Sequence, residues 1–85
     1  MDYHLIPQHT KETIDNYANK GWDPGSFVHA VLANDLSGAF GRADIFNRMA
    51  MFEIVSYVHN NVPSCVHGSY EVVDSWLKRW AKDSK

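Results

Sequence analysis

The residues with the richest side-chain chemistry lie together in the middle third of the chain, within an otherwise apolar stretch. They are Asn34, Asp35, Arg42, Asp44, Asn47 and Arg48. Arginine presents planar donors that match carboxylates and phosphates, and asparagine both donates and accepts hydrogen bonds. Polar groups in an apolar frame must find partners or bear the cost of their desolvation. This polar group is therefore the candidate site for binding a ligand or a partner.

Two interpretations of the polar group stay open from the sequence. In the structural one, Arg42 forms an ion network with Asp35 and Asp44 that caps a kinked helix, and Asn47 fixes the register of a helical interface. An ion pair is also expected between Asp44 and Arg48, which are four residues apart. In the functional one, Arg42, Asn47 and Arg48 line a pocket for a small anionic or amide-rich ligand.

A second group, near the C-terminus, combines aromatic and cationic side chains. It consists of Trp76, Lys78, Arg79, Trp80 and Lys82. Aromatic rings beside cations are typical of surfaces that bind nucleic acid, so a nucleic-acid-binding regulator is the alternative function. At helical spacing, however, the tryptophans follow the apolar face and the cations the opposite face, which favours core packing with a solvated basic face.

Motifs for catalysis or metal binding are missing from the sequence. None of the five histidines has another histidine three or four residues away, and Cys65 is the only cysteine. Neither a metal-ligand spacing nor an intrachain disulfide is therefore encoded. We predict a non-enzymatic protein with no metal and no cofactor. A hydrolase or transferase centred on Arg42, Asp44 and His67 is the least favoured alternative.

Hydrophobic periodicity predicts an all-α fold of about four helices, a small helical bundle forming a single domain over residues 1–85. The expected helices cover residues 10–21, 23–34, 35–60 and a last segment that begins at Ser69. The third is the long central helix. It is either continuous or kinked near Gly38 and Gly41, because each glycine weakens a helix interior by about 1 kcal/mol.

The central helix carries two apolar stripes. The first contains Leu36, Phe40, Ala43, Ala50, Ile54 and Tyr57, and the second contains Ile45, Met49, Phe52 and Val55. One stripe is enough to dock a helix on its own domain, whereas two need cover from several neighbours or from another subunit. The pattern therefore predicts a homo-oligomer that assembles through this helix.

Composition narrows the setting. The chain has 85 residues, 45% of them hydrophobic, and a formal net charge of −2. This balance gives no general attraction to nucleic acid or to acidic membranes. The N-terminus has no signal-peptide pattern, and no segment approaches the roughly 20 apolar residues of a membrane span. We expect a cytoplasmic protein that makes no membrane contact.

Several short motifs resemble the core of small uncharacterised proteins of tailed bacteriophages and prophages. The matching residues are Pro24-Gly25-x-Phe27, Ala30-Val31-Leu32-x-Asn34-Asp35-Leu36, Arg42-Ala43-Asp44 with Asn47, and Gly68-Ser69 followed by Val73 and Trp76. The resemblance extends from about residue 6 to residue 76. The sequence departs from the pattern at Val66-His67, where an aromatic residue is expected.

The resemblance implies a setting rather than an activity. It implies an accessory phage protein in the cytoplasm of a bacterial host, and small helical proteins of this kind often inhibit a host enzyme, a defence complex or a signalling nucleotide. We therefore predict a non-enzymatic counter-defence factor. It would act as a homo-oligomer that sequesters a host or defence protein or a small anionic ligand.

Overall fold

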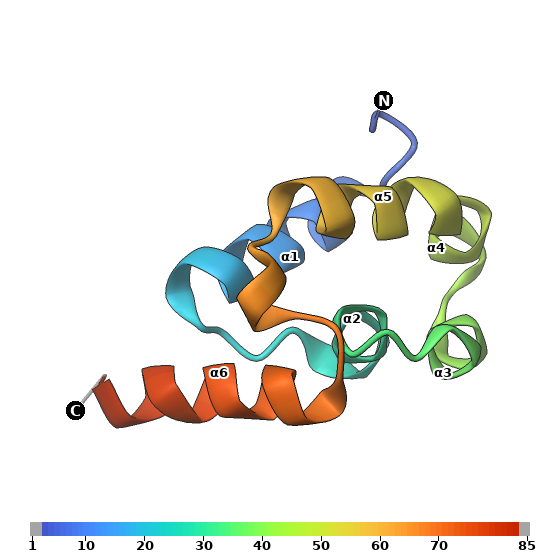
Figure 1. Ribbon diagram of the computed structural model, residues 1–85. Helices are drawn as coiled ribbons and strands as arrows, with labels where there is room; N and C mark the ends of the chain where they lie inside the picture. Colours follow the sequence, from blue (N-terminus) through green and yellow to red (C-terminus); the bar gives the residue numbers. More distant parts are fainter. Residues whose placement is uncertain (1–2, 84–85) are drawn as a thin grey trace.

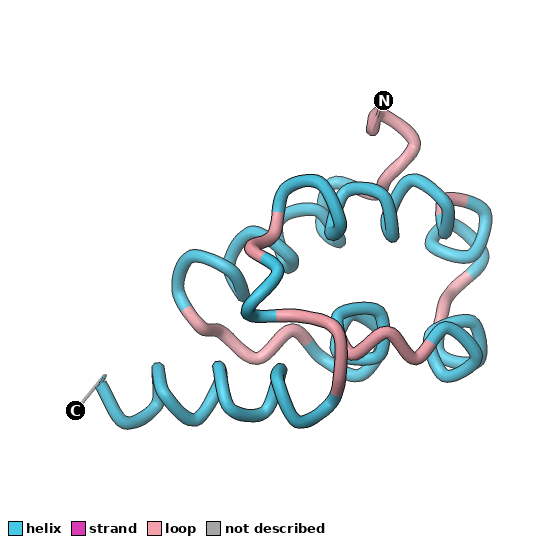
Figure 2. Tube along the Cα trace, viewed as in Figure 1, coloured by secondary structure: helices cyan, strands magenta, loops and turns pink. Residues whose placement is uncertain are grey.

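Every regular element of the protein is helical within residues 3–83, which are the residues that the computed structural model describes, with side chains up to Ala81 (Figure 2). The helices are α1 (Gln8–Lys20), α2 (Gly25–Leu32), α3 (Leu36–Arg42), α4 (Ile45–Met49), α5 (Met51–Asn61) and α6 (Tyr70–Asp83), with a 3₁₀ turn η1 (Ser64–Val66) before α6. The predicted all-α class is confirmed. The described residues form six helices where about four were expected.

The helices form two layers around one apolar core (Figure 1). In one layer α4 and α5 follow each other along a common line with α1 beside them, and the other layer contains α2, α3 and α6. Helix α2 contacts α1, α3 and α6 and so joins the layers. The largest fully buried side chains between them are Ile14, Tyr17, Leu32, Ile54 and Val73.

Local capping signals determine where several helices end, as the sequence predicts. Gly21 adopts the left-handed conformation (φ 66°) and ends α1, and Asn34 adopts it (φ 63°) just after α2. Ser69 accepts a hydrogen bond from the backbone N–H of Val72 at 3.2 Å and so caps α6. These turns fix the angles at which the helices enter the two layers.

The prediction of one long central helix is wrong. The backbone becomes extended at Ala43 and Asp44, and the Asp44 carboxylate accepts the N–H of Asn47 at 2.8 Å, which starts α4 as a new helix. The break does not fall at Gly38 or Gly41, which both lie inside α3. A second, smaller distortion at Ala50 separates α4 from α5.

Candidate functional site

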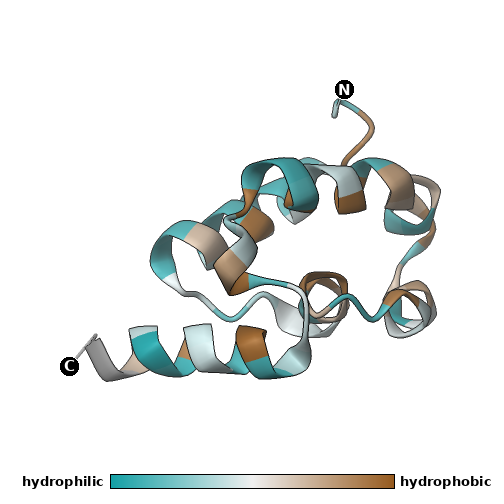
Figure 3. Ribbon diagram, viewed as in Figure 1, coloured by the Kyte–Doolittle hydropathy of each residue, from teal (hydrophilic) through white to brown (hydrophobic). Residues whose placement is uncertain are grey.

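The outer side of α4 and α5 carries several exposed apolar side chains, which we call the apolar face. Its members are Ile45, Phe46, Met49, Phe52 and Val55. On α4 and α5 the exposed fractions reach 64% for Ile45, 70% for Phe46, 77% for Met49 and 68% for Phe52. Hydrophobic residues recur along these helices in Figure 3. Exposed apolar patches on a protein surface mark interaction sites.

Hydrogen bonds hold the inner side of α4 and α5 against α1, and this sets which side faces outward. Asn47 accepts a hydrogen bond of 2.6 Å from the buried hydroxyl of Thr10 on α1. Tyr57 donates a bond of 2.6 Å to Asp15, and burial together with that carboxylate raises the pKa of Tyr57 to about 12. Ala50 and Ile54 are buried between these two contacts.

Of the two predicted stripes, one is largely covered and the other is not. In the first stripe Ala43, Ala50, Ile54 and Tyr57 are buried, but Leu36 and Phe40 are exposed, because the break at residues 43–44 separates α3 from α4 and α5. Every member of the second stripe is exposed. The single chain therefore leaves the second stripe without cover.

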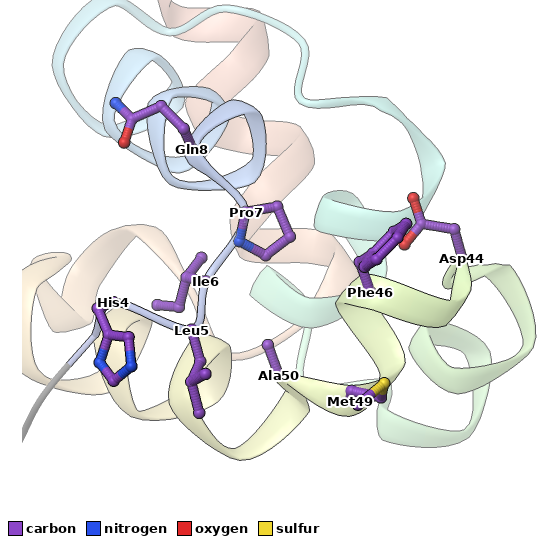
Figure 4. Close-up of a pocket in the computed structure, with 9 residues that line it drawn as sticks. All are labelled: His4, Leu5, Ile6, Pro7, Gln8, Asp44, Phe46, Met49 and Ala50. Carbon is purple, nitrogen blue, oxygen red and sulfur yellow. The ribbon is translucent and has the colours of Figure 1, made fainter.

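A cavity of about 590 Å³ adjoins the apolar face, between α4 and the segment before α1 (Figure 4). Its lining consists of His4, Leu5, Ile6, Pro7, Gln8, Asp44, Phe46, Met49 and Ala50. Leu5 and Pro7 lie on one side, opposite Phe46 and Met49. The sequence interpretation missed Leu5 and Phe46, because neither belongs to a helical stripe.

Two of the predicted site residues, Asn34 and Asp35, lie in the turn between α2 and α3. Asp35 caps α3 by accepting the N–H of Gly38 at 2.9 Å, and it also accepts the hydroxyl of Tyr70 on α6 at 2.5 Å. These bonds, the Tyr70 bond foremost, hold the pKa of the Asp35 carboxyl below its usual value. Asn34 is exposed beside it. Tyr70, which has no special spacing in the sequence, is thus an unforeseen partner.

Among the described residues Arg42 makes neither of its predicted ion pairs, although it lies near enough to Asp35 to help lower the pKa of that carboxyl. Arg42 donates to the carbonyl of Gly38 at 3.2 Å, and Arg48 makes a long contact of 3.4 Å with the carbonyl of Ala43. Asp44 caps α4 and makes no ion pair with Arg48 among the described residues. Both aspartates are used as helix caps because each precedes a helix start, where orphan N–H groups attract a carboxylate.

The predicted ligand pocket forms only in part. Arg42, Asp44 and Asn47 line one cavity of about 290 Å³ together with residues of α1 and the start of α2, but Arg48 does not. Asp44 places a carboxylate in the same lining, which opposes an anionic ligand there. The six predicted polar residues therefore position helices more than they converge on one pocket.

On α6 the aromatic and basic residues separate only in part, because Arg79 lines one cavity together with Trp76. The indole of Trp76 donates to the carbonyl of Tyr17 at 2.8 Å and packs edge-on against Trp80, which lies over Gly21. Lys78 and Arg79 are exposed. The side chain of Lys82 lies outside the described part of the chain. Rings packed on α1 are poor platforms for stacking bases.

A partly buried histidine is a further feature that the sequence interpretation did not identify. The Nε2 atom of His67 is buried and makes no hydrogen bond, while a backbone bond to Val62 engages the ring elsewhere. Burial lowers the pKa of His67, and the nearby His59 lowers it further. Both histidines line a cavity of about 330 Å³ near Asn34 and Val55.

Comparisons with protein-family models, with curated proteins and with solved structures find no match to this chain. The described residues contain no group of three or more His, Cys, Asp or Glu side chains arranged to hold a metal ion. Within residues 3–83, no helix combines the length and apolar character needed to cross a membrane. The function of the site therefore follows from its own residues alone.

Proposed function

We propose that this protein acts by binding rather than by catalysis, as a homo-oligomer that assembles through the apolar face. The observation that carries the proposal is the exposure of Ile45, Phe46, Met49 and Phe52, each more than 60% exposed. Burying one such side chain stabilises a complex by roughly 1.5–3 kcal/mol. Because a chain of this size buries only a small core, covering this apolar surface with another subunit or a partner adds to its stability.

A protein is the better-supported partner for this binding function. Leu36 and Phe40 on α3, and Leu5 beside the 590 Å³ cavity, are exposed apolar side chains outside the row on α4 and α5. They are exposed apolar sites, separate from the apolar face, that a host or defence protein would cover. The nucleic-acid alternative has less support because Trp76 and Trp80 pack on α1.

We include in this proposal the cellular setting that the sequence resemblance implies. An accessory phage protein in the cytoplasm of a bacterial host would inhibit or sequester its target without turnover, as a counter-defence factor does. Binding of a small anionic ligand has less support, because Asp44 places a carboxylate in the cavity that Arg42 lines.

Light scattering on a sizing column tests the self-association. The wild-type chain is expected to elute as an oligomer at micromolar concentration, and Met49→Asp is expected to shift it to the monomer because a charge cannot be buried cheaply. Trp22→Asp is the matched control, since Trp22 is 56% exposed but lies between α1 and α2. A monomeric wild type, or equal effects of both variants, would contradict the proposal.

A further inference from the structure

Three apolar residues of α4 and α5 form a continuous row despite the distortion at Ala50. Two side-chain bonds to α1, from Thr10 to Asn47 and from Tyr57 to Asp15, turn the inner sides of both helices towards α1. Ile45, Met49 and Phe52, spaced by four and then three residues and each more than 60% exposed, therefore lie on the outer side of the two helices. We call this row the seam. Its spacing is that of the d, a and d positions of a coiled coil.

The seam is flanked by opposite charges. Arg48 directly precedes Met49, and Glu53 directly follows Phe52, so the two charges lie on opposite edges of the row. In the register of the seam, Arg48 occupies a g position and Glu53 the e position five residues later. In a parallel pair of helices these are the positions that meet across the interface, and opposite charges there set orientation and partner choice.

An antiparallel arrangement does not use these charges. A two-fold axis across antiparallel helices brings each edge of the seam against the same edge of the other copy. Arg48 would then face the edge that carries Arg48 and Val55, and Glu53 would face the edge that carries Phe46 and Asn60 and find no cation. Charge complementarity therefore selects the parallel arrangement.

Both charges are free to take such partners. Among the described residues, Arg48 has only its 3.4 Å contact with the Ala43 carbonyl, and neither Arg48 nor Glu53 joins an ion pair. The exposed parts of the apolar side chains on α4 and α5 amount to on the order of 600 Å² per subunit, near the roughly 800 Å² per partner of a standard interface.

From this seam and its flanking charges we infer that a second copy of the chain covers α4 and α5 in a parallel, two-fold arrangement. Met49 meets the partner's Met49 near the axis, and Arg48 of each copy pairs with Glu53 of the partner subunit. The inference rests on the proposed function, because it specifies how the self-associating face is covered. It also leaves Leu36 and Leu5, which are outside the seam, for a further partner.

Charge exchange tests the pairing separately from self-association. Sedimentation equilibrium at low salt measures the dimer dissociation constant of the wild type, Arg48→Glu, Glu53→Arg and the double variant. Each single variant is expected to weaken dimerisation about tenfold, and the double variant to recover most of the loss. Arg79→Glu, an exposed arginine on α6, is the control and is expected to change nothing.

The outcomes are distinguishable. If the wild type dimerises and the double variant is no tighter than the single ones, the parallel pairing is wrong while the proposed self-association stands. If the wild type stays monomeric at all concentrations, both are wrong. Helical content measured by circular dichroism confirms that each variant is folded, as expected for Arg48, which is exposed, and Glu53, which is half-buried.

Disulfide trapping tests the direction of the helices. In a Cys65→Ser background, Ile45→Cys alone is expected to give a disulfide-linked dimer, since residue 45 faces its own counterpart in the parallel arrangement. An antiparallel pair centred on Met49 would place residue 45 beside the partner's Phe52. An antiparallel dimer would cross-link only when Ile45→Cys and Phe52→Cys chains are mixed, and that result would overturn the inference.

Discussion

The hydroxyl of Thr10 donates a hydrogen bond of 2.6 Å to the side-chain oxygen of Asn47 and ties α1 to α4 across 37 residues of sequence. Thr10 is almost fully buried. Because Asn47 points inward, Ile45 and Met49 on the same short helix point outward. One polar contact in the interior thus orients α4, which carries two of the three seam residues.

Removing this contact is expected to destabilise the fold. Asn47→Ala leaves the buried Thr10 hydroxyl without its acceptor and should lower the free energy of unfolding by about 1–3 kcal/mol. Urea denaturation measures the loss. Thr13→Ala, which removes an exposed bond to the carbonyl of His9, is the control and should cost less than 1 kcal/mol. Equal costs for the two variants would contradict a special role for Asn47.

The bond from Tyr70 to Asp35 is expected to be visible in the titration of the carboxyl group. Tyr70→Phe should raise the pKa of Asp35 towards its usual value of 3.8, since the Tyr70 hydroxyl is the main group that lowers it. Carbonyl-detected NMR titration measures this, with Tyr3→Phe as the control. An Asp35 pKa that is unchanged in Tyr70→Phe would show that the bond does not persist in solution.

The sign of the Asp35 effect on stability follows from the same shift. A lowered carboxyl pKa in the folded state contributes stability at pH values above the unfolded pKa, and the contribution is lost as pH falls through the folded pKa. Tyr70→Phe should therefore be less stable than the wild type at neutral pH. The difference between the two proteins should narrow in strong acid.

Burial of His67 is expected to make the fold acid-sensitive in a mild range. The unfolded chain takes up a proton near the ordinary pKa of 6.5, while the folded ring stays neutral to lower pH. Stability should therefore fall as pH drops from about 7 to 5. His67→Leu should flatten this dependence, whereas His9→Gln, at an exposed site, should keep it. A wild-type stability that is flat over this range would contradict the burial of His67.

Two glycines provide a matched pair of opposite effects. At Gly21 a Cβ atom would overlap the side chain of Trp80, and φ is 66°, so Gly21→Ala should cost about 2 kcal/mol or more. At Gly41, inside α3, a Cβ atom meets open space, so Gly41→Ala should stabilise by up to about 1 kcal/mol. Thermal unfolding compares them, and a neutral Gly21→Ala would contradict the packing of Trp80.

Features encoded by neighbouring residues could be predicted from the sequence. Gly21, Asn34 and Ser69 mark helix ends because their conformations or hydroxyl groups satisfy orphan backbone groups within a few residues. The apolar periodicity of residues 45–55 likewise revealed a stripe that the single chain leaves exposed. These signals are local, and the structure follows them.

Features that depend on distant or competing partners could not be predicted. Asp44 has two local uses, as an ion-pair partner of Arg48 or as a helix cap, and spacing alone does not decide between them. The break at residues 43–44 followed from the cap. The bonds from Thr10 to Asn47 and from Tyr70 to Asp35 join residues 37 and 35 positions apart, so no local pattern announces them.

The oxidation rates of two methionines on neighbouring helices test most directly whether a second copy covers the apolar face. Met49 is 77% exposed on the apolar face, and Met51 is 5% exposed in the core. Peroxide oxidation of each residue, followed by peptide mass spectrometry over a range of protein concentrations, reports how far each sulfur is covered. At nanomolar concentration Met49 should oxidise much faster than Met51, and its rate should fall several-fold as the chain associates. A Met49 rate that stays fast and independent of protein concentration would show that no second copy covers the face.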